Sequence, residues 1–545
     1  MIQPTPETPD AGEPPARRRL AAAAWVGGFG LCALPVFLGL LNHDVAWYLH
    51  AAGRVLAGRR LYVDVVEINP PLIVWLNFAP IGLARAAGIS EVAALRLLVL
   101  GLVAGSLLAT REALRLALPD RPSARRPTLA LALFALVPLA GYDFGQREHL
   151  MFALFLPYLV LASARARGRA AGVGLSWAVG LMAGVGLALK PHFALPWVAV
   201  EAWLAWETRG ERGRGWRWAW PRPEVVAVVA SGLAYAAAVL AIAPEYRDVV
   251  RWARPVYAGA VPASLPDLLG RPATGLTLFA LLGFAAVRPR GDGREGPASL
   301  LVAALGLLGI AFLQAKGFPY HFYPPLAAAT IAIGLLAAGP APAPASADDR
   351  GRRRAVLLTR GVLAAVVILT VALRANESRL WRGRPGESDT DVGRMIRLAR
   401  GPGGEPRTLF VFSPAVAASF PLVTYAGAGW ASRHPCLWFL TALHPAGLPA
   451  SKGPTPAMGR TERHLFDSVV ADLLRDRPDL LIVDEAGAKP AFGGGRFDFL
   501  AYYSRDPGFA AFLRDYEPFD ALGPFRVYRR TAPAASTPRV AGGRR

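Results

Sequence analysis

Long apolar stretches recur through the first two thirds of the chain. From residue 20 to about residue 373, runs of roughly 15–22 mostly apolar residues alternate with short charged loops. A helix needs about 20 such residues to cross a bilayer, so the pattern is typical of membrane-spanning helices. The hydrophobic content of 53% and the mean hydropathy of +0.33 agree with this. The sequence therefore predicts a polytopic α-helical membrane protein.

We expect about eleven spans. They cover residues 22–41, 92–110, 127–141, 150–163, 171–189, 192–206, 224–243, 273–287, 298–314, 322–339 and 355–373. The first run resembles a cleaved signal peptide in length, but the chain stays hydrophobic after it, which favours a span. The apolar stretch 70–88 contains Pro80 and Arg85 and begins with two prolines, so we expect an interfacial or re-entrant helix there. The alternative is that this stretch spans the membrane.

Arginine marks one side of the membrane. With residues 1–21 as a cytoplasmic tail and 70–88 not spanning, clusters of arginine all fall on the inner side, in the loops 111–126, 164–170, 207–223, 288–296 and 340–354. This is the arrangement that the positive-inside rule requires. The net charge of +21 is therefore interpreted as a topology signal, and no nucleic-acid motif accompanies it. We expect a multi-pass protein of the bacterial inner membrane with its N-terminus inside.

The composition changes after the last expected span. Residues 22–373 form the predicted membrane domain, and 374–530 have the mixed composition of a soluble domain. Strand-like runs at 408–412, 480–484 and 525–528 alternate with helix-like runs near 463–475 and at 507–513, which predicts a C-terminal α/β domain. Counting spans places this domain outside the cytoplasm. Residues 531–545 are predicted to be a disordered tail.

The outer loops carry the residues that suit chemistry. The predicted outer loops with catalytic groups are 42–91, 142–149, 244–272 and 315–321. All eight histidines fall on the outer side, and so do two of the four lysines, Lys190 and Lys316, at outer ends of spans. A purely structural set of loops does not need this sorting. We therefore expect the functional site at the outer face.

The first outer loop begins with Asn42-His43-Asp44 and continues to Tyr48 and Glu67. Asp44 follows the first span directly, where a carboxylate is partly desolvated and still reaches a water-borne substrate. These are the conditions that a general base needs. The alternative is that His43 and Asp44 only cap a helix and anchor it at the interface.

The second outer loop, 142–149, is short and densely polar. It contains Asp143, Arg147, Glu148 and His149. One interpretation is a solvated loop whose charges pair with one another. The other is a second carboxylate together with an anion-binding arginine, both facing the first loop.

Two further outer segments place a cation next to a histidine. The first holds Lys190 and His192, and the second holds Lys316, Tyr320 and His321. Snorkelling of a lone lysine is the structural alternative. However, a compact ammonium is a good ligand for phosphate, and arginine supplies almost every other positive charge here. Such cations near the headgroup plane would suit an anionic, lipid-borne substrate.

Together these features resemble the GT-C superfamily of membrane glycosyltransferases. The resemblance rests on an acidic residue after the first span, a long first outer loop with Pro70-Pro71-Leu72, an acidic second loop and a periplasmic tail. The similarity is to bacterial relatives of protein O-mannosyltransferases and of the lipid A aminoarabinose transferase. Those families carry Asp-Glu in the first loop and often Lys-Pro-Pro. This chain has His43-Asp44 and Asn69-Pro70-Pro71 instead, so Lys190 or Lys316 would have to replace a lysine that binds the donor phosphate.

The resemblance implies an inverting glycosyltransferase with a GT-C-like fold. The donor would be a sugar linked to polyprenyl phosphate, and the acceptor an unknown hydroxyl of the cell envelope. Asp44 would be the base, and the outer cations would bind the phosphate. Some superfamily members use a divalent metal ion and others do not; His43, Asp44 and Asp143 are candidate ligands, but no metal-binding motif is present. The other hypothesis is a transporter or flippase of polyprenyl-linked glycans, which should place ionisable residues inside its spans, where Glu201 is the main candidate.

Overall fold

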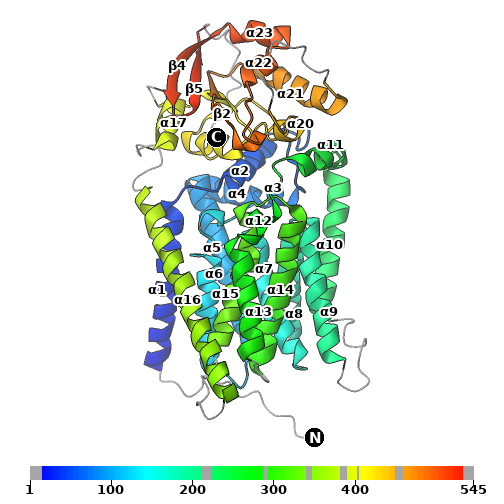
Figure 1. The fold of residues 1–545 in the computed structure, drawn as a ribbon, viewed down its shortest axis with the longest axis vertical. Coiled ribbons are helices and arrows are strands. Elements are labelled where there is room, and N and C mark those ends of the chain that lie inside the picture. Colours follow the sequence, from blue (N-terminus) through cyan, green and yellow to red (C-terminus); the bar gives the residue numbers. More distant parts are fainter. Residues whose placement is uncertain are drawn as a thin grey trace.

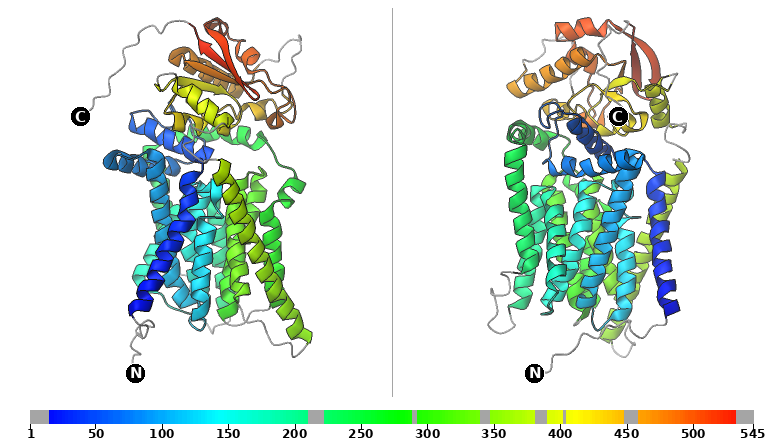
Figure 2. Two further views of the ribbon diagram at one scale, coloured as in Figure 1. Left: turned by 90° about the vertical axis from the view of Figure 1, so that its left-hand side faces the viewer. Right: turned by 180° about the vertical axis from the view of Figure 1, so that it is seen from behind.

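The computed structural model describes residues 15–209, 222–287, 292–338, 347–380, 390–401, 404–447 and 458–531. Residues 1–14 of the predicted cytoplasmic tail and 532–545 of the predicted disordered tail lie outside this part of the chain. A helical bundle forms one end of the molecule, and a smaller domain containing a β-sheet covers the other (Figure 1). The first helix of the bundle, α1 (Pro15–Leu38), begins at the end that is distant from the sheet domain (Figures 1 and 2).

Within the described residues, each of the eleven expected spans coincides with a helix of the bundle. These helices are α1 (Pro15–Leu38), α5 (Glu91–Ala117), α6 (Pro122–Leu136), α7 (Arg147–Ala166), α8 (Val173–Ala188), α9 (Ala194–Thr208), α10 (Pro223–Ile242), α13 (Pro272–Val287), α14 (Asp292–Gln314), α15 (Pro319–Ala337) and α16 (Ala347–Leu380). Seven of them, in this part of the chain, are long and apolar enough to cross a bilayer. The prediction of a multi-pass helical membrane protein is confirmed.

Burial distinguishes central from peripheral helices. The most apolar window of α7 is 100% buried and that of α15 is 89% buried, whereas the windows of α1 and α16 are 6% and 17% buried. Helix α7 therefore runs through the middle of the bundle, and α1 and α16 present apolar side chains to the surroundings. Such exposed apolar faces are what lipid-facing helices require. The first residues of α7 are those of the predicted second outer loop.

Short helices lie at the end of the bundle next to the sheet domain (Figures 1 and 2). They are α2 (His43–Leu56), α3 (Leu72–Leu76), α4 (Phe78–Ala87), α11 (Tyr246–Gly259) and α12 (Leu265–Leu269). The longer of the two helices in the 70–88 stretch, α4, has 10 residues. At 1.5 Å per residue it extends about 15 Å, half of the hydrocarbon thickness. As the two prolines and Arg85 predicted, this segment does not cross the bundle.

The C-terminal domain is built on a five-stranded sheet with the strand order β2-β1-β3-β5-β4. The strands are β1 (Thr408–Phe412), β2 (Gly429–Trp430), β3 (Leu480–Asp484), β4 (Tyr516–Leu522) and β5 (Phe525–Arg530). Strands β1, β2 and β3 are parallel, and β5 runs antiparallel to β3 and β4. The accompanying helices are α17 (Asp391–Arg400), α18 (Val416–Ser419), α19 (Leu422–Ala426), α20 (Leu440–Leu443), α21 (Arg460–Asp476), α22 (Phe499–Tyr503) and α23 (Pro507–Leu513). The predicted α/β domain is confirmed.

The sheet domain is joined to the bundle by a continuous apolar core. One cluster of buried side chains extends from α7 through α2 into the sheet domain. Backbone contacts reinforce it: the Val66 N–H donates to the Arg433 carbonyl at 2.7 Å, and the Arg54 guanidinium donates to the Trp430 carbonyl at 3.2 Å. The sheet domain therefore lies directly over the first outer loop.

Candidate active site

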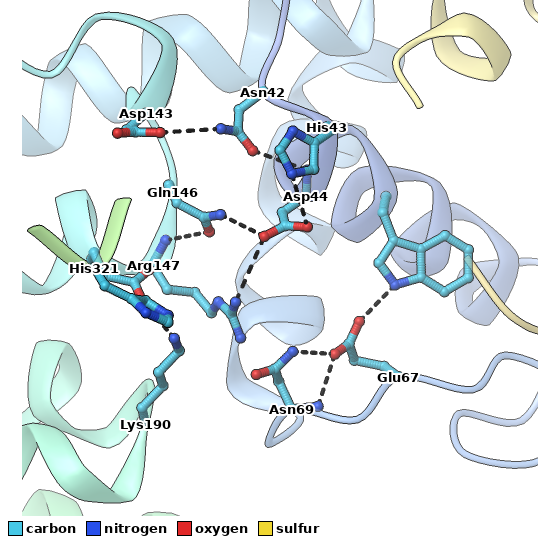
Figure 3. A network of polar contacts seen from close by, with 12 residues as sticks. Asn42, His43, Asp44, Glu67, Asn69, Asp143, Gln146, Arg147, Lys190 and His321 are labelled. Carbon is cyan, nitrogen blue, oxygen red and sulfur yellow. Dashed lines mark hydrogen bonds and ion pairs between the residues drawn. The ribbon is translucent and has the colours of Figure 1, made fainter. Parts of the chain in front are cut away.

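Two helix starts meet beneath the sheet domain, and polar residues cap both of them. The Asn42 side-chain oxygen accepts a hydrogen bond from the Asp44 N–H at 2.9 Å, which caps α2. The Gln146 side-chain oxygen accepts one from the Arg147 N–H at 2.9 Å, which caps α7. Caps of this kind satisfy N–H groups that have no partner inside the helix. They also place the side chains of both predicted loops toward each other (Figure 3).

Asp44 lies at the centre of this junction. Its Oδ2 accepts a hydrogen bond from the Gln146 side-chain amide at 2.7 Å and lies 3.8 Å from an Arg147 guanidinium nitrogen. Its Oδ1 lies 3.7 Å from Nε2 of His43, and the side chain is 15% exposed. One oxygen thus accepts from Gln146 and faces Arg147, and the other lies next to the His43 ring. The alternative role of Asp44 as a mere helix cap does not describe this position, because Asn42 is the cap.

Asp143 joins the same network through Asn42. The Asn42 side-chain amide donates to Oδ1 of Asp143 at 3.4 Å (Figure 3). The backbone N–H of His43 donates to the Tyr142 hydroxyl at 3.1 Å, and Nδ1 of its ring lies 3.1 Å from the same oxygen. The two loops, about 100 residues apart in sequence, are therefore connected side chain to side chain, as the prediction of a shared site requires.

Arg147 is a buried cation with spare hydrogen-bonding capacity. Its side chain is 4% exposed, and its guanidinium lies 5.1 Å from the centre of the Tyr48 ring. Within the described structure, its Nε and one Nη atom have no hydrogen-bond partner. Buried donors without partners are rare in folded proteins. At the N-terminus of α7, where the helix dipole also favours negative charge, they form a place for an anion.

Next to Arg147 is a second buried group of charges. The Lys190 ammonium pairs with Oε1 of Glu148 at 2.5 Å, and Nε2 of His321 lies 3.8 Å from the same oxygen. The Lys190 nitrogen also lies 5.7 Å from the centre of the Tyr320 ring. Neither ring nitrogen of His321 has a hydrogen-bond partner in the described residues. Lys190 of the first predicted pair and His321 of the second thus lie against Glu148 of the second loop.

Burial controls the protonation of the loop residues at this end of the bundle. It lowers the pKa of Lys190 to about 8, an effect that the charge of Arg147 reinforces and Glu148 opposes. Burial, together with the Lys190 charge, lowers the pKa of His192 to about 4, so His192 is neutral at pH 7. The ammonium of Lys190 is therefore the titratable cation of this group.

Glu67 faces the site from the other end of the first loop. Its Oε2 accepts a hydrogen bond from the Trp47 indole at 2.6 Å, and its Oε1 accepts from the Asn69 backbone at 2.8 Å and from the Asn69 side-chain amide. Burial raises the pKa of Glu67, and Arg147 and these donors oppose the rise. Asn69, which precedes Pro70 and Pro71, thus binds a carboxylate in this chain.

These carboxylates do not fit a divalent metal ion in this arrangement. The Asp44 carboxylate faces N–H donors of Gln146 and Arg147. The Glu67 carboxylate accepts from N–H donors of Trp47 and Asn69. Among the residues described, no group of three or more His, Cys, Asp or Glu side chains is placed to hold a metal. A metal would have to displace these donors.

Two residues predicted for the site have structural partners. Lys316 donates to the carbonyls of Tyr257, Ala258 and Ala260 at 2.6, 3.0 and 2.5 Å. His149 lies between the Leu136 carbonyl, 2.7 Å from its Nε2, and the Gly145 N–H, which donates to its Nδ1 at 3.2 Å. Lys316 therefore fixes the end of α11, and His149 fixes the second loop against α6.

A cavity of about 190 Å³ adjoins the polar network. Val36, Leu41 and Phe144 contribute to its apolar wall, and Asn42 and Tyr142 line it next to the site. Gly141 suits this position because its φ is +50°, a conformation that other residues rarely adopt. The cavity thus extends from the periphery of the bundle, beside α1, to the residues that contact His43 and Asp143.

Solved structures with the same architecture are known. The crystal structure of ArnT from Cupriavidus metallidurans bound to undecaprenyl phosphate aligns with 95% of this chain and 100% of its own, with a TM-score of 0.55 and 16% sequence identity. ArnT in the apo state aligns with 93% of this chain and 98% of its own, with a TM-score of 0.53 and 16% identity. The fold predicted from the resemblance is confirmed. No protein-family description matches the sequence, and no curated protein matches it.

Sequence reasoning missed several residues of the site. Gln146, which donates to Asp44, gives no signal by itself, since amides in loops are common. Trp47 and Asn69 hold Glu67, but their distance from Glu67 in space does not follow from their spacing in the sequence. For Asn69, the departure from Lys-Pro-Pro was the available signal.

Proposed function

We propose that this protein is an inverting glycosyltransferase that moves a sugar from a polyprenyl-phosphate donor to an acceptor hydroxyl at the outer face of the membrane. The observation that carries the proposal is the position of Asp44, which lies 3.8 Å from the buried Arg147 guanidinium and two residues after Asn42, a residue that lines the cavity. The fold shared with ArnT supports it, because ArnT has been crystallised with undecaprenyl phosphate. The acceptor remains an unspecified lipid, glycan or protein of the envelope.

The chemistry is a single displacement. Asp44 takes the proton of the acceptor hydroxyl, and the hydroxyl oxygen forms a bond to the anomeric carbon. The bond between that carbon and the phosphate oxygen breaks, and its electron pair leaves with the polyprenyl phosphate. The hydrogen bond from Gln146 and the proximity of Arg147 orient the carboxylate during this step.

The cations act on the leaving group. The donor is a phosphodiester with one negative charge, and the product is a monoester that approaches two at neutral pH. Arg147, with its unpartnered N–H groups, and Lys190 stabilise the charge that develops, so their effect is greatest in the transition state. His321 and the neutral His192 border the same space. Glu148 keeps the Lys190 ammonium in place.

The acceptor approaches from the cavity side. The cavity reaches Asn42 and Tyr142, which contact Asp143 and His43. An acceptor there would lie next to Asn42 and Tyr142, and attack opposite the leaving group is what inversion requires. Asp143, bound to Asn42, would contact other hydroxyls of the acceptor.

The transport hypothesis has less support. Glu201, the main ionisable residue expected within a span, accepts a hydrogen bond from the Tyr158 hydroxyl at 2.6 Å and pairs with Arg222. Glu224 pairs with Arg165 at 2.9 Å. These charges satisfy each other inside the bundle, as a structural pair does. Arg147, which has two unpartnered guanidinium nitrogens in the described structure, lies instead at the end of the bundle below the sheet domain.

The test is sugar transfer in membranes that contain the wild-type chain or Asp44→Asn, with a panel of radiolabelled polyprenyl-phosphate sugars. We expect the variant to lose about 10²–10⁴-fold in rate, the range of general base catalysis. Asp248→Asn, on exposed α11, is the matched control and should transfer normally. Equal transfer by Asp44→Asn would exclude Asp44 as the base. Wild-type chain that transports a labelled glycan lipid but transfers no sugar would favour the transporter.

A further inference from the structure

The sheet domain contacts the helix that carries Asp44 on both sides of that residue. The Tyr425 hydroxyl accepts a hydrogen bond from the Leu41 N–H at 3.0 Å, three residues before Asp44. The Phe420 ring lies 5.3 Å from the ring of Trp47, three residues after it. Both contacts come from one short segment of the sheet domain, which includes α18 and α19.

The contact at Tyr425 fixes the junction between α1 and α2. Its hydroxyl also accepts from the Arg96 guanidinium at 3.3 Å. Arg96 in turn donates to the Gly39 carbonyl at 2.5 Å and to the Phe37 carbonyl at 3.3 Å. The end of α1, Arg96 of α5 and the sheet domain are thus tied together at the residue before Asn42. Because Asn42 caps α2, a shift of Leu41 would move the cap and Asp44 with it.

The contact at Phe420 connects the sheet domain to Glu67. The Phe420 side chain is fully buried, against Trp47 and also against His50 at 5.3 Å. Edge-on packing of this kind fixes the orientation of both rings. The Trp47 indole, so oriented, donates to Glu67 at 2.6 Å. On the Glu67 side, the Val66 N–H is bound to the Arg433 carbonyl of the sheet domain.

We infer that Phe420 and Tyr425 are positioning residues of the transfer reaction: the sheet domain supplies them to hold α2 so that Asp44 stays against Gln146 and Arg147. The inference rests on the proposed function. Neither residue touches Asp44, so neither is catalytic. Their effect follows from geometry, because a displacement of about 1 Å at a reacting group can cost on the order of 10²-fold in rate.

The first test compares Tyr425→Phe with Tyr516→Phe in the full-length protein. Tyr425→Phe removes the acceptor of the Leu41 N–H and keeps the ring. Tyr516 donates its hydroxyl to the Pro478 carbonyl at 2.6 Å, within the sheet domain, so Tyr516→Phe is a matched loss of one hydroxyl. We expect kcat to fall about 10-fold in Tyr425→Phe, with KM for the donor unchanged within a factor of about two. Tyr516→Phe should keep its kcat.

The second test uses Phe420→Ala, Phe420→Leu and a control of equal burial, Phe509→Ala. Phe420→Ala should lower kcat, and Phe420→Leu, which refills most of the volume, should recover it. Phe509 is fully buried in the sheet domain. Phe509→Ala should therefore lower the thermal unfolding temperature and have only a small effect on kcat. The inference would be overturned if Phe420→Ala and Phe509→Ala lowered kcat by the same factor for the same decrease in unfolding temperature.

Hydrogen exchange gives a readout that does not depend on activity. In the full chain in nanodiscs, the amides of α2 should exchange several-fold faster in Tyr425→Phe and Phe420→Ala than in the wild type, and Tyr516→Phe should match the wild type. Unchanged exchange in α2 would overturn the inference, and so would faster exchange with an unchanged kcat. A wild-type chain without transfer activity would instead refute the proposed function, whatever α2 does.

Discussion

Gln146 and Asp44 share a hydrogen bond of 2.7 Å although they lie 102 positions apart in the sequence. The same Gln146 side chain accepts from the Arg147 N–H, so one amide both caps the central helix and orients the proposed base. The amide nitrogen can only donate, and it binds Oδ2 of the carboxylate. The cap of α7 and the orientation of the proposed base thus depend on one residue.

Replacing Gln146 by leucine should lower kcat. A hydrogen bond to a charged group contributes about 1.5–3 kcal/mol, which corresponds to roughly 10–100-fold in rate if the bond acts fully in the transition state. The measurement is transfer rate against donor concentration. Gln314→Leu, which removes an amide at the end of α14, is the control and should keep wild-type kcat. An unchanged rate in Gln146→Leu would show that Arg147 alone orients Asp44.

The transfer rate should fall as the pH rises through about 8. Burial, together with the charge of Arg147, lowers the pKa of Lys190 to about 8, so its ammonium is charged below this pH and loses its proton above it. The donor phosphate then loses one of its cations. The measurement is kcat/KM, which reports groups of the free enzyme, between about pH 6 and pH 10.

Lys190→Arg supplies the control for this pH dependence. A guanidinium stays charged across this range, so the alkaline limb should move to higher pH in this variant. If the limb stayed at about pH 8, another group would be responsible for it.

Lys316 and Lys190 should differ in what their loss changes. Lys316→Met leaves three carbonyls without their shared donor, and unsatisfied buried groups cost about 1–3 kcal/mol each. We therefore expect a lower unfolding temperature with nearly normal activity per folded molecule. Lys190→Met should instead lower kcat at least about 10-fold, because it removes a phosphate ligand. Fluorescence-detected thermal unfolding together with transfer assays distinguishes the two, and the opposite pattern would exchange their roles.

Chelation should leave transfer intact. Asp44 and Glu67 are engaged by N–H donors, which compete with a cation for the same oxygens. After dialysis of the protein against EDTA, we expect the initial rate to stay within a factor of about two of the untreated rate. A loss that added Zn²⁺, Mg²⁺ or Mn²⁺ restores would show that substrate binding rearranges these carboxylates into a metal site.

The spans and their order follow from the sequence because membrane insertion depends on local hydropathy. Each expected span is a helix, and the interruption of 70–88 by Pro80 and Arg85 identified a segment that does not cross the bundle. The strands at 408–412 and 480–484 are continuous apolar runs, so they could also be predicted from the sequence. The edge strand β2 has two residues, too few for any periodicity to reveal.

The sequence predicted candidate residues for the site but not their contacts. Asp44, Arg147 and Lys190 became candidates because they lie in the predicted outer loops, where the histidines and two of the four lysines also fall. Whether a given cation is available depends on partners that are distant in sequence. In the sequence pattern, Lys190 and Lys316 are equivalent. The structure distinguishes them, because Lys316 donates to three carbonyls near Tyr257. The roles of Phe420 and Tyr425 could not be predicted from the sequence for the same reason. They are ordinary aromatic residues of a separate domain, and their partners are distant in the sequence.

The contact between Leu41 and Tyr425 also affects how the protein is made. The two residues are 384 positions apart, so at 5–20 residues per second the ribosome needs roughly 20 to 80 s to proceed from one to the other. During that time α1 and α2 already exist, but the partner of Leu41 has not been synthesised, translocated or folded. The contact that holds the proposed base is therefore completed among the last events of biogenesis. If synthesis stops before the sheet domain, the membrane contains an inserted bundle in which Asp44 is not held in place.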